Sequence, residues 1–125
     1  MTNQEVQKRA VRMAMRFEIK QNRSPKDISR AQSGEGYDIK SGMRKIEVKG
    51  FSGALPSKIV LNYYNYKAYK KNKNFWLYLV YNIDHKPQLV TLHRKDIEGE
   101  EYTQFEVQLN KKALTVFDFP RVGVI

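Results

Sequence analysis

The sequence predicts an α/β sandwich with helices on a central mixed β-sheet, in the order helix, strand, strand, strand, helix, strand, strand. Three patterns lead to this prediction: an amphipathic helical segment opens the chain, short alternating segments follow, and one strongly apolar run comes after them. The chain has 125 residues, the size of one ordinary domain, so we expect a single domain over residues 1–125.

Residues 3–22 are expected to form the first helix. An apolar stripe recurs there at helical spacing and consists of Val6, Ala10, Met13 and Phe17. The opposite face carries charged residues at the same spacing, namely Glu5, Arg9, Arg12 and Arg16. Pro25 disfavours helical backbone at Ser24, so the helix is predicted to end before it, with a loop over residues 24–35.

The middle of the chain predicts a hairpin and then a second helix. Residues 37–39 and 45–49 are expected strands on either side of a turn at Gly42, and the second strand alternates with a period of two. Residues 50–57 predict a loop, residues 59–61 a short apolar strand, and residues 62–72 a helix rich in Tyr and Lys.

The run over residues 75–81, Phe-Trp-Leu-Tyr-Leu-Val-Tyr, is the most apolar in the chain. Its length and aromatic content predict a central strand buried on both faces. Residues 88–92 predict a further strand, and residues 102–109 a polar strand or an irregular segment. The apolar tail from Phe117 onwards is expected to dock on the core or on a second subunit.

The charge balance indicates a polyanionic partner. Lys and Arg number 23 against 13 Asp and Glu, a net charge of +10, which is typical of proteins that bind nucleic acid. The absence of cysteine excludes disulfides and thiolate chemistry. No segment has the apolar length of a signal peptide or membrane span. We therefore expect no membrane partner and a cytoplasmic location, inside a prokaryotic cell or a virus-infected host cell.

A candidate metal site arises from the hairpin around Gly42. Glu47 and Lys49 leave the same face of their strand because they are two residues apart. If residues 42–43 form a two-residue loop, opposite residues sum to 85, and Asp38 lies opposite Glu47. Two such carboxylates repel unless a cation lies between them, and their oxygen atoms suit Mg²⁺ or Mn²⁺. This arrangement suits phosphodiester hydrolysis, with Lys49 orienting the metal-activated water or stabilising the transition-state charge.

The motif around these residues resembles a known family. Gly-Tyr-Asp-Ile-Lys-Ser at residues 36–41 and Ile-Glu-Val-Lys-Gly at residues 46–50 resemble the signature of the domain at the C-terminus of the plant NO VEIN protein. That domain also occurs in bacterial and archaeal proteins and is similar to the PD-(D/E)xK, or restriction-endonuclease-like, superfamily. The resemblance covers about residues 14–83 and implies a restriction-endonuclease-like sandwich.

The resemblance implies that Asp38 and Glu47 bind Mg²⁺ or Mn²⁺ and that Lys49 is catalytic. It also implies an acid from the first helix. Glu18 is favoured over Glu5, because helical spacing places Glu18 inside the apolar arc. Related domains often place an acid at the start of the helix after the third strand, where this chain has the uncharged Asn65. The implied activity is that of a metal-dependent endonuclease, with DNA as the expected substrate.

Basic residues outside this cluster, together with Asn65, are expected to contact the nucleic acid. The expected contacts are Arg9, Arg12, Arg16, Lys45, Asn65, Lys70, Lys71 and Lys73. Lysines interleave with four tyrosines that are candidates for stacking with bases, namely Tyr63, Tyr64, Tyr66 and Tyr69. Tyr66 and Tyr69 share one side of the second helix, which equally predicts a core stripe. A homodimer is attractive because two DNA strands need two active sites. The alternatives are a catalytically inactive nucleic-acid-binding protein with the same fold, or a structural protein, of viral type, whose charge serves packaging.

Overall fold

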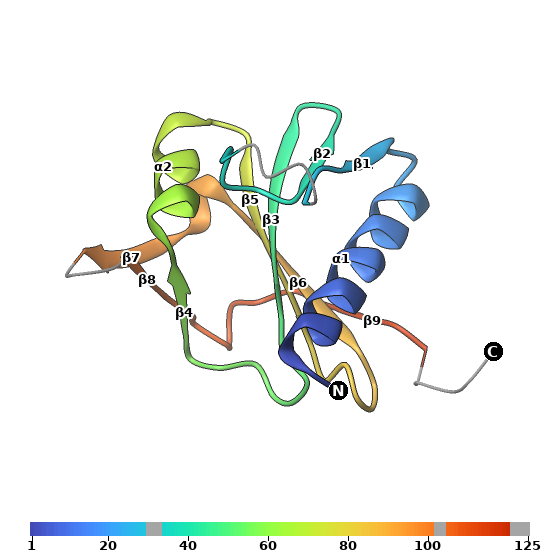
Figure 1. Cartoon of the computed structure of the whole chain (residues 1–125). Helices are drawn as coiled ribbons and strands as arrows, with labels where there is room; N and C mark the ends of the chain where they lie inside the picture. The colour runs from blue at the N-terminus through green and yellow to red at the C-terminus, as the bar shows by residue number, and fades with distance from the viewer. Residues whose placement is uncertain (30–33, 102–104, 121–125) are drawn as a thin grey trace.

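The computed structural model describes residues 1–29, 34–101 and 105–120 (Figure 1). Within these residues neither α-helix is long and apolar enough to cross a membrane. The elements, in chain order, are α1 (Asn3–Lys20), β1 (Pro25–Asp27), β2 (Ile39–Ser41), β3 (Arg44–Gly50), β4 (Lys58–Leu61), α2 (Tyr63–Lys71), β5 (Phe75–Tyr81), β6 (Gln88–His93), the 3₁₀ helix η1 (Arg94–Asp96), β7 (Glu98–Glu101), β8 (Phe105–Gln108) and β9 (Val116–Asp118).

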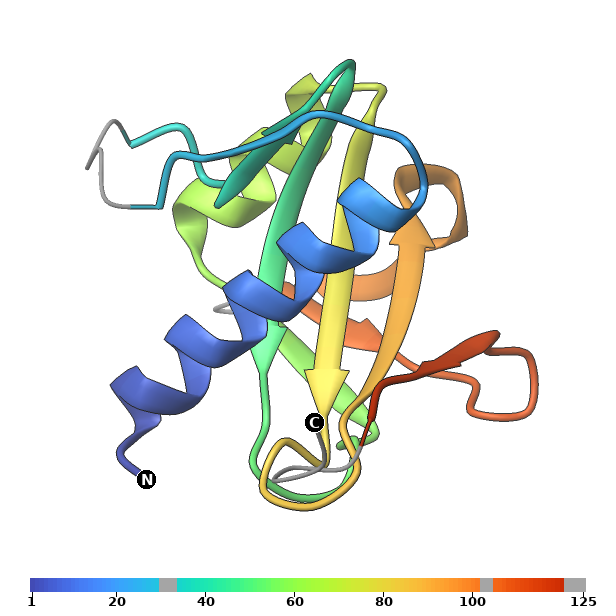
Figure 2. The same cartoon turned by 90° about the vertical axis from the view of Figure 1, so that its right-hand side faces the viewer.

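The centre of the molecule is a mixed sheet with the strand order β1-β2-β3-β5-β6-β9. Its β3 and β5 strands are parallel, whereas its other neighbours are antiparallel. Helix α1 lies across one face, and α2 lies behind the sheet in the same view (Figure 2). A small sheet, β4-β8-β7, shares the core on the α2 side. The predicted α/β sandwich around a central mixed sheet is therefore confirmed.

Strand β5 supplies both layers of the core, as its uninterrupted apolar sequence predicts. Tyr78 and Val80 pack in the layer beneath α1. Leu77 and Leu79 point the other way and pack with residues of β4, α2 and β8. All four side chains are fully buried, so the predicted central strand is confirmed.

Helix α1 begins at a capping box, in which the Thr2 side chain accepts from the Glu5 amide and the Glu5 side chain accepts from the Thr2 amide. It ends at Lys20, close to the predicted boundary. The prediction of an unbroken loop after it is wrong, because residues 25–27 pair with β2 as an edge strand. Pro25 is tolerated there because it is the first residue of a strand at the sheet edge.

The C-terminal third contains strands that the sequence did not indicate. The predicted segment 102–109 contains β8, while residues 102–104 lie outside the described residues. Strand β7, Glu-Gly-Glu-Glu, is too polar for its pairing with β8 to be visible in the sequence. Phe117 and Phe119 pack beneath α1, so the described part of the tail docks on the core, as one of the two predictions stated. Residues 121–125 lie outside the described residues.

Candidate active site

The hairpin of β2 and β3 has the predicted register. Ile39 pairs with Ile46 and Ser41 with Arg44, so opposite residues sum to 85. Gly42 occupies the two-residue loop with a φ of +58°, a left-handed conformation that glycine adopts without strain. Asp38 immediately precedes the first strand pair and donates its amide to the Ile46 carbonyl at 2.8 Å. Asp38 therefore lies just before β2 begins, beside the part of β3 that β2 does not pair with.

Beyond Ile46, side chains take the place of a neighbouring strand and hydrogen-bond to the backbone at this edge of β3. The Val48 amide donates to Oδ2 of Asp38 at 2.9 Å. Nε2 of Gln7, from α1, donates to the Val48 carbonyl at 2.7 Å, and the Gly50 amide donates to Oε1 of Gln7 at 3.0 Å. Unpaired backbone groups at a sheet edge require such partners when they are shielded from water. Asp38 is thereby held against β3 by the backbone itself.

Glu47 and Lys49 meet on the face of β3 that is turned away from α1. Oε2 of Glu47 lies 3.1 Å from Nζ of Lys49, and Glu47 is only 6% exposed. The Lys49 ammonium also donates to Oδ1 of Asn65, from α2, at 3.1 Å. Asp38 lies near enough to Glu47 for its charge to raise the pKa of Glu47. The structure thus brings together the three residues that the motif predicted.

Asn65 is an internal bridge rather than a surface contact. Its Oδ1 also accepts from the Asn62 amide at 3.3 Å, which caps α2, and its Nδ2 donates to the Gly36 carbonyl at 3.0 Å. Because Asn65 is only 4% exposed, the prediction that it contacts nucleic acid is wrong. It instead ties Lys49 to the segment that precedes Asp38.

Gly36 explains the first position of the motif. Its φ is +82°, and a Cβ there would lie 2.1 Å from the Tyr64 carbonyl oxygen. No other residue fits this close approach to the first turn of α2 without moving backbone. The glycine therefore sets the path of the chain into Asp38.

Burial perturbs both carboxyl groups, and the charge of Asp38 adds to the perturbation of Glu47. Burial, together with the charge of Asp38, raises the pKa of Glu47 well above its ordinary value, although Lys49 opposes the shift. The pKa of Asp38 is also raised, mainly by burial, while the Val48 amide, Glu47 and Lys49 oppose that change. These directions mean that the charged forms of both groups are disfavoured where they lie. An additional positive charge beside the pair would favour the ionised form of both carboxyl groups.

Replacing Glu47 with glutamine is expected to stabilise the metal-free protein at neutral pH. A carboxyl whose pKa is raised by folding loses stability as pH rises from its unfolded pKa to its folded pKa. Glutamine carries no charge to desolvate, so the free energy of unfolding should increase by about 1 kcal/mol, or roughly 4 °C in Tm. Thermal unfolding in EDTA at several pH values measures this, and the advantage should vanish in acid. A lower Tm for Glu47→Gln at neutral pH would contradict the assigned pKa shift.

Asp38 opens into a small cleft between α1 and β1. The cleft has a volume of about 180 Å³, and its lining includes Gln7, Lys8, Arg12 and Asp27. Arg12, one of the predicted nucleic-acid contacts, therefore lies beside the Asp38 end of the cluster. Lys8 and Arg12 are both exposed and bring positive charge to this cleft.

Glu18 does not join this cluster. It is fully buried on the α1 side of the sheet, where Tyr78 donates its hydroxyl to Oε2 at 2.7 Å. Nε and Nη2 of Arg23 donate to its two oxygens at 2.6 and 2.7 Å. The prediction that Glu18 completes the site is therefore wrong, because the sheet lies between it and Glu47. The prediction that the Glu18 side chain points inward is correct, but both of its oxygens already accept hydrogen bonds from Arg23.

Gln7 is the residue of α1 that reaches the site, and sequence reasoning missed it. A signal for it exists, because Gln7, Val11, Ala14 and Glu18 follow one helical stripe. A polar side chain inside an apolar arc needs a buried partner, and Gln7 finds one on the edge of β3.

The other basic residues that were predicted to contact nucleic acid lie on α1, on or just after α2, and in a cavity beside α2. Arg9 and Arg16 are exposed on α1, and Lys70 and Lys73 are exposed on or just after α2. Lys45 and Lys71 instead line a cavity beside α2. Of the tyrosines, Tyr66 and Tyr69 stack against Phe105, which favours the core stripe over base contacts.

The sandwich and this cluster define an α/β protein with a partly buried Asp-Glu-Lys cluster beside the edge of β3 that β2 leaves unpaired. The family model of the C-terminal domain of protein NO VEIN matches residues 6–92, and the chain belongs to that family. The matched region contains Gln7, Asp38, Glu47, Lys49 and Asn65. No curated protein and no solved structure matches the chain.

Proposed function

We propose that the chain is a metal-dependent nuclease of the PD-(D/E)xK type that hydrolyses phosphodiester bonds, with DNA as the expected substrate. One observation carries the proposal. Asp38 and Glu47 are neighbouring carboxyl groups with raised pKa values, and Nζ of Lys49 lies 3.1 Å from Oε2 of Glu47. Buried groups with perturbed pKa values that share a cluster with a lysine are typical of catalytic sites.

The donor set fits a hard divalent cation. Among the described residues no three His, Cys, Asp or Glu side chains gather to hold a metal, so the protein would provide the two carboxylates alone. Mg²⁺ suits such a site, because it is usually bound by one or two carboxylates and keeps several waters. A bound Mg²⁺ or Mn²⁺ supplies a water of lowered pKa and neutralises charge on the phosphate. Val48 fixes Asp38 for this role through its amide.

Lys49 is the expected electrostatic catalyst. Its ammonium is held between Glu47 and Asn65, so it is already oriented before substrate binds. A preorganised cation beside a phosphate stabilises the negative charge that develops in the transition state. Lys8 and Arg12 would hold the flanking backbone from the adjacent cleft. For duplex DNA we propose a homodimer, since each strand needs its own site.

The test is a cleavage assay on plasmid and single-stranded DNA with Mg²⁺, Mn²⁺ or EDTA. We expect cleavage with either metal and none with EDTA. Asp38→Ala should reduce the cleavage rate by at least about 100-fold, because the site loses a metal ligand. The exposed acid Asp84 provides a matched control, and Asp84→Ala should cleave like the wild type. DNA binding without cleavage under every condition would instead support the inactive nucleic-acid-binding alternative.

A further inference from the structure

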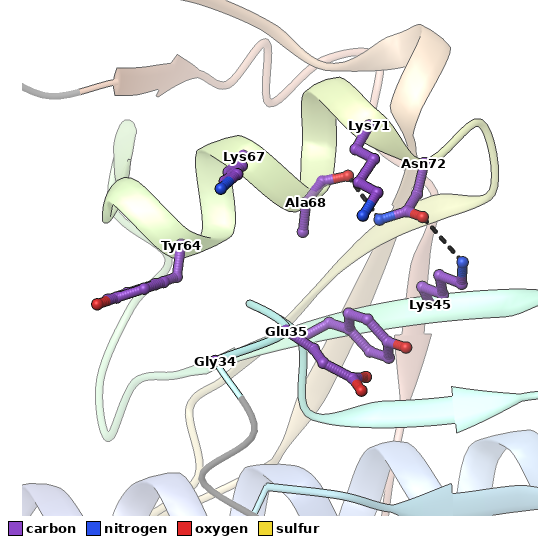
Figure 3. A pocket seen from close by; sticks show the side chains of 9 residues that line it. Gly34, Glu35, Lys45, Tyr64, Lys67, Ala68, Lys71 and Asn72 are labelled. Carbon is purple, nitrogen blue, oxygen red and sulfur yellow. Dashed lines mark hydrogen bonds between the residues drawn. The ribbon is translucent and has the colours of Figure 1, made fainter.

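A second polar cavity lies between α2 and the chain segment that leads into Asp38 (Figure 3). It has a volume of about 420 Å³, within the range of small-ligand pockets. We name it the lysine cavity after the three lysines in its lining. The polar and aromatic lining includes Lys45, Lys67, Lys71, Tyr64, Asn72 and Glu35.

The lysine cavity has an excess of positive charge. Lys67 and Lys71 extend from α2, and Lys45 reaches Asn72 from β3 on the opposite side (Figure 3). Nζ of Lys45 donates to Oδ1 of Asn72 at 2.8 Å, a neutral partner that leaves its charge uncompensated. No ion pair among the described residues includes any of the three lysines. Glu35 contributes a carboxylate to the lining, against the three lysines. An anionic ligand is therefore expected.

Exposed tyrosines stand beside these lysines. Tyr64 lines the cavity and is 56% exposed, and the neighbouring Tyr63 is 68% exposed. Their ring centroids lie 5.5 Å apart in an edge-to-face arrangement, and Nζ of Lys67 lies 5.9 Å from the Tyr63 ring centroid. Aromatic rings next to cations bind unpaired nucleotides, since the rings stack with bases while the cations hold phosphates. The sequence suggested four tyrosines for this role, and two of them, Tyr66 and Tyr69, pack on Phe105 instead.

The lysine cavity adjoins the proposed active site. Lys45 and Glu47 are two residues apart on one strand, a rise of roughly 6.6 Å. That spacing is comparable with the separation of neighbouring phosphates along a nucleic-acid strand. Tyr37 lines the cavity, and the next residue, Asp38, lines the cleft that contains Arg12. A strand passing Asp38 would therefore place its adjoining nucleotide in the lysine cavity.

We propose that the lysine cavity binds one unpaired nucleotide next to the scissile phosphate, with its phosphate on the lysines and its base against Tyr64. This rests on the proposed nuclease function and specifies its substrate as single-stranded nucleic acid or the single-stranded part of a branched structure. Bases inside a duplex are paired and stacked, so they cannot reach Tyr64. The cavity thus gives the protein a preference for unpaired over paired nucleotides, which its net positive charge alone does not provide.

Binding measured in EDTA tests this without cleavage. The probes are a fluorescein-labelled oligothymidylate and a duplex of the same length, followed by fluorescence anisotropy. For Lys67→Ala/Lys71→Ala we expect the Kd for oligothymidylate to rise at least about 10-fold, and for Tyr64→Ala at least about 5-fold. The matched control is Lys86→Ala/Lys112→Ala, which removes two exposed lysines elsewhere. Duplex binding should weaken equally in the two double variants, and melting curves establish that each variant is folded.

Two results would overturn the proposal. In the first, the cavity variants bind oligothymidylate as tightly as the matched control does. In the second, the cavity variants lose as much affinity for the duplex probe as for the single-stranded probe. The nuclease proposal fails separately. Wild-type protein that prefers single strands in EDTA but never cleaves with Mg²⁺ retains the cavity inference and loses the activity. Protein that cleaves, with cavity variants that bind like the control, retains the activity and loses the cavity.

Discussion

Replacing Lys49 with alanine is expected to reduce the rate constant of Mg²⁺-dependent cleavage by roughly 100- to 1,000-fold, the usual loss for one preorganised electrostatic group. The ammonium lies 3.1 Å from Oε2 of Glu47 and from Oδ1 of Asn65. Both contacts orient it before substrate arrives, so its loss leaves no other cation in the same place. Single-turnover cleavage at saturating Mg²⁺ measures the effect.

The pH profile separates this role from a general loss of charge. The charge of Lys49 lowers the pKa of Glu47, so its removal should raise that pKa further. The acidic limb of the rate profile should then move to higher pH, because Glu47 must lose its proton to bind the cation. Lys49→Arg should restore the limb but not the full rate, since a guanidinium is larger and differently shaped.

A matched control for Lys49 is Lys40→Ala, an exposed lysine of the neighbouring strand β2. It removes the same charge and should leave both the rate constant and the pH profile unchanged. Lys49→Ala with wild-type cleavage would refute the catalytic assignment of this lysine. A rate loss with no movement of the acidic limb would refute its coupling to Glu47.

Replacing Glu18 with alanine is expected to lower the free energy of unfolding by about 3 kcal/mol, as for other broken buried ion pairs. Glu18 is fully buried and accepts hydrogen bonds from Arg23 and from the Tyr78 hydroxyl. Alanine would leave Tyr78 without this acceptor and create a cavity under α1. Urea unfolding measures the loss, and Glu98→Ala, at an exposed acid of β7, is the control.

Acid should narrow the difference between wild type and Glu18→Ala. Burial by itself raises the pKa of Glu18, but the hydrogen bonds from Arg23 and Tyr78 lower it below its ordinary value. A carboxyl with a lowered folded pKa contributes stability above its unfolded pKa and loses it as pH falls through the folded pKa. A difference that stays constant into strong acid would contradict this linkage.

The same residue tests the position of the active site. Glu18→Gln keeps the shape of the side chain and lies across the sheet from Glu47. Its folded fraction should therefore cleave at the wild-type rate once the loss of stability is taken into account. If a folded Glu18→Gln variant no longer cleaved, Glu18 would be required for catalysis after all.

Local periodicity determined much of the fold and the centre of the site. The stripe on α1, the apolar run of β5 and the alternation of β3 each follow from how often side chains return to one face of a helix or strand. The hairpin register also depends only on a short loop, so Asp38, Glu47 and Lys49 could be placed together from neighbouring residues alone. The two-residue loop at Gly42 and its register agree with the structure.

Only the tertiary structure decided which polar residues complete that centre and which do not. Gln7 and Asn65 reach the β3 strand from two helices far away in the sequence, and Tyr78 reaches Glu18 across 60 residues. The lysine cavity likewise combines β3, α2 and the segment before Asp38. Such contacts depend on how the layers pack, and no local pattern encodes them. For that reason the sequence placed Asp38, Glu47 and Lys49 together, while the partners of Glu18 and Asn65 emerged only from the folded chain.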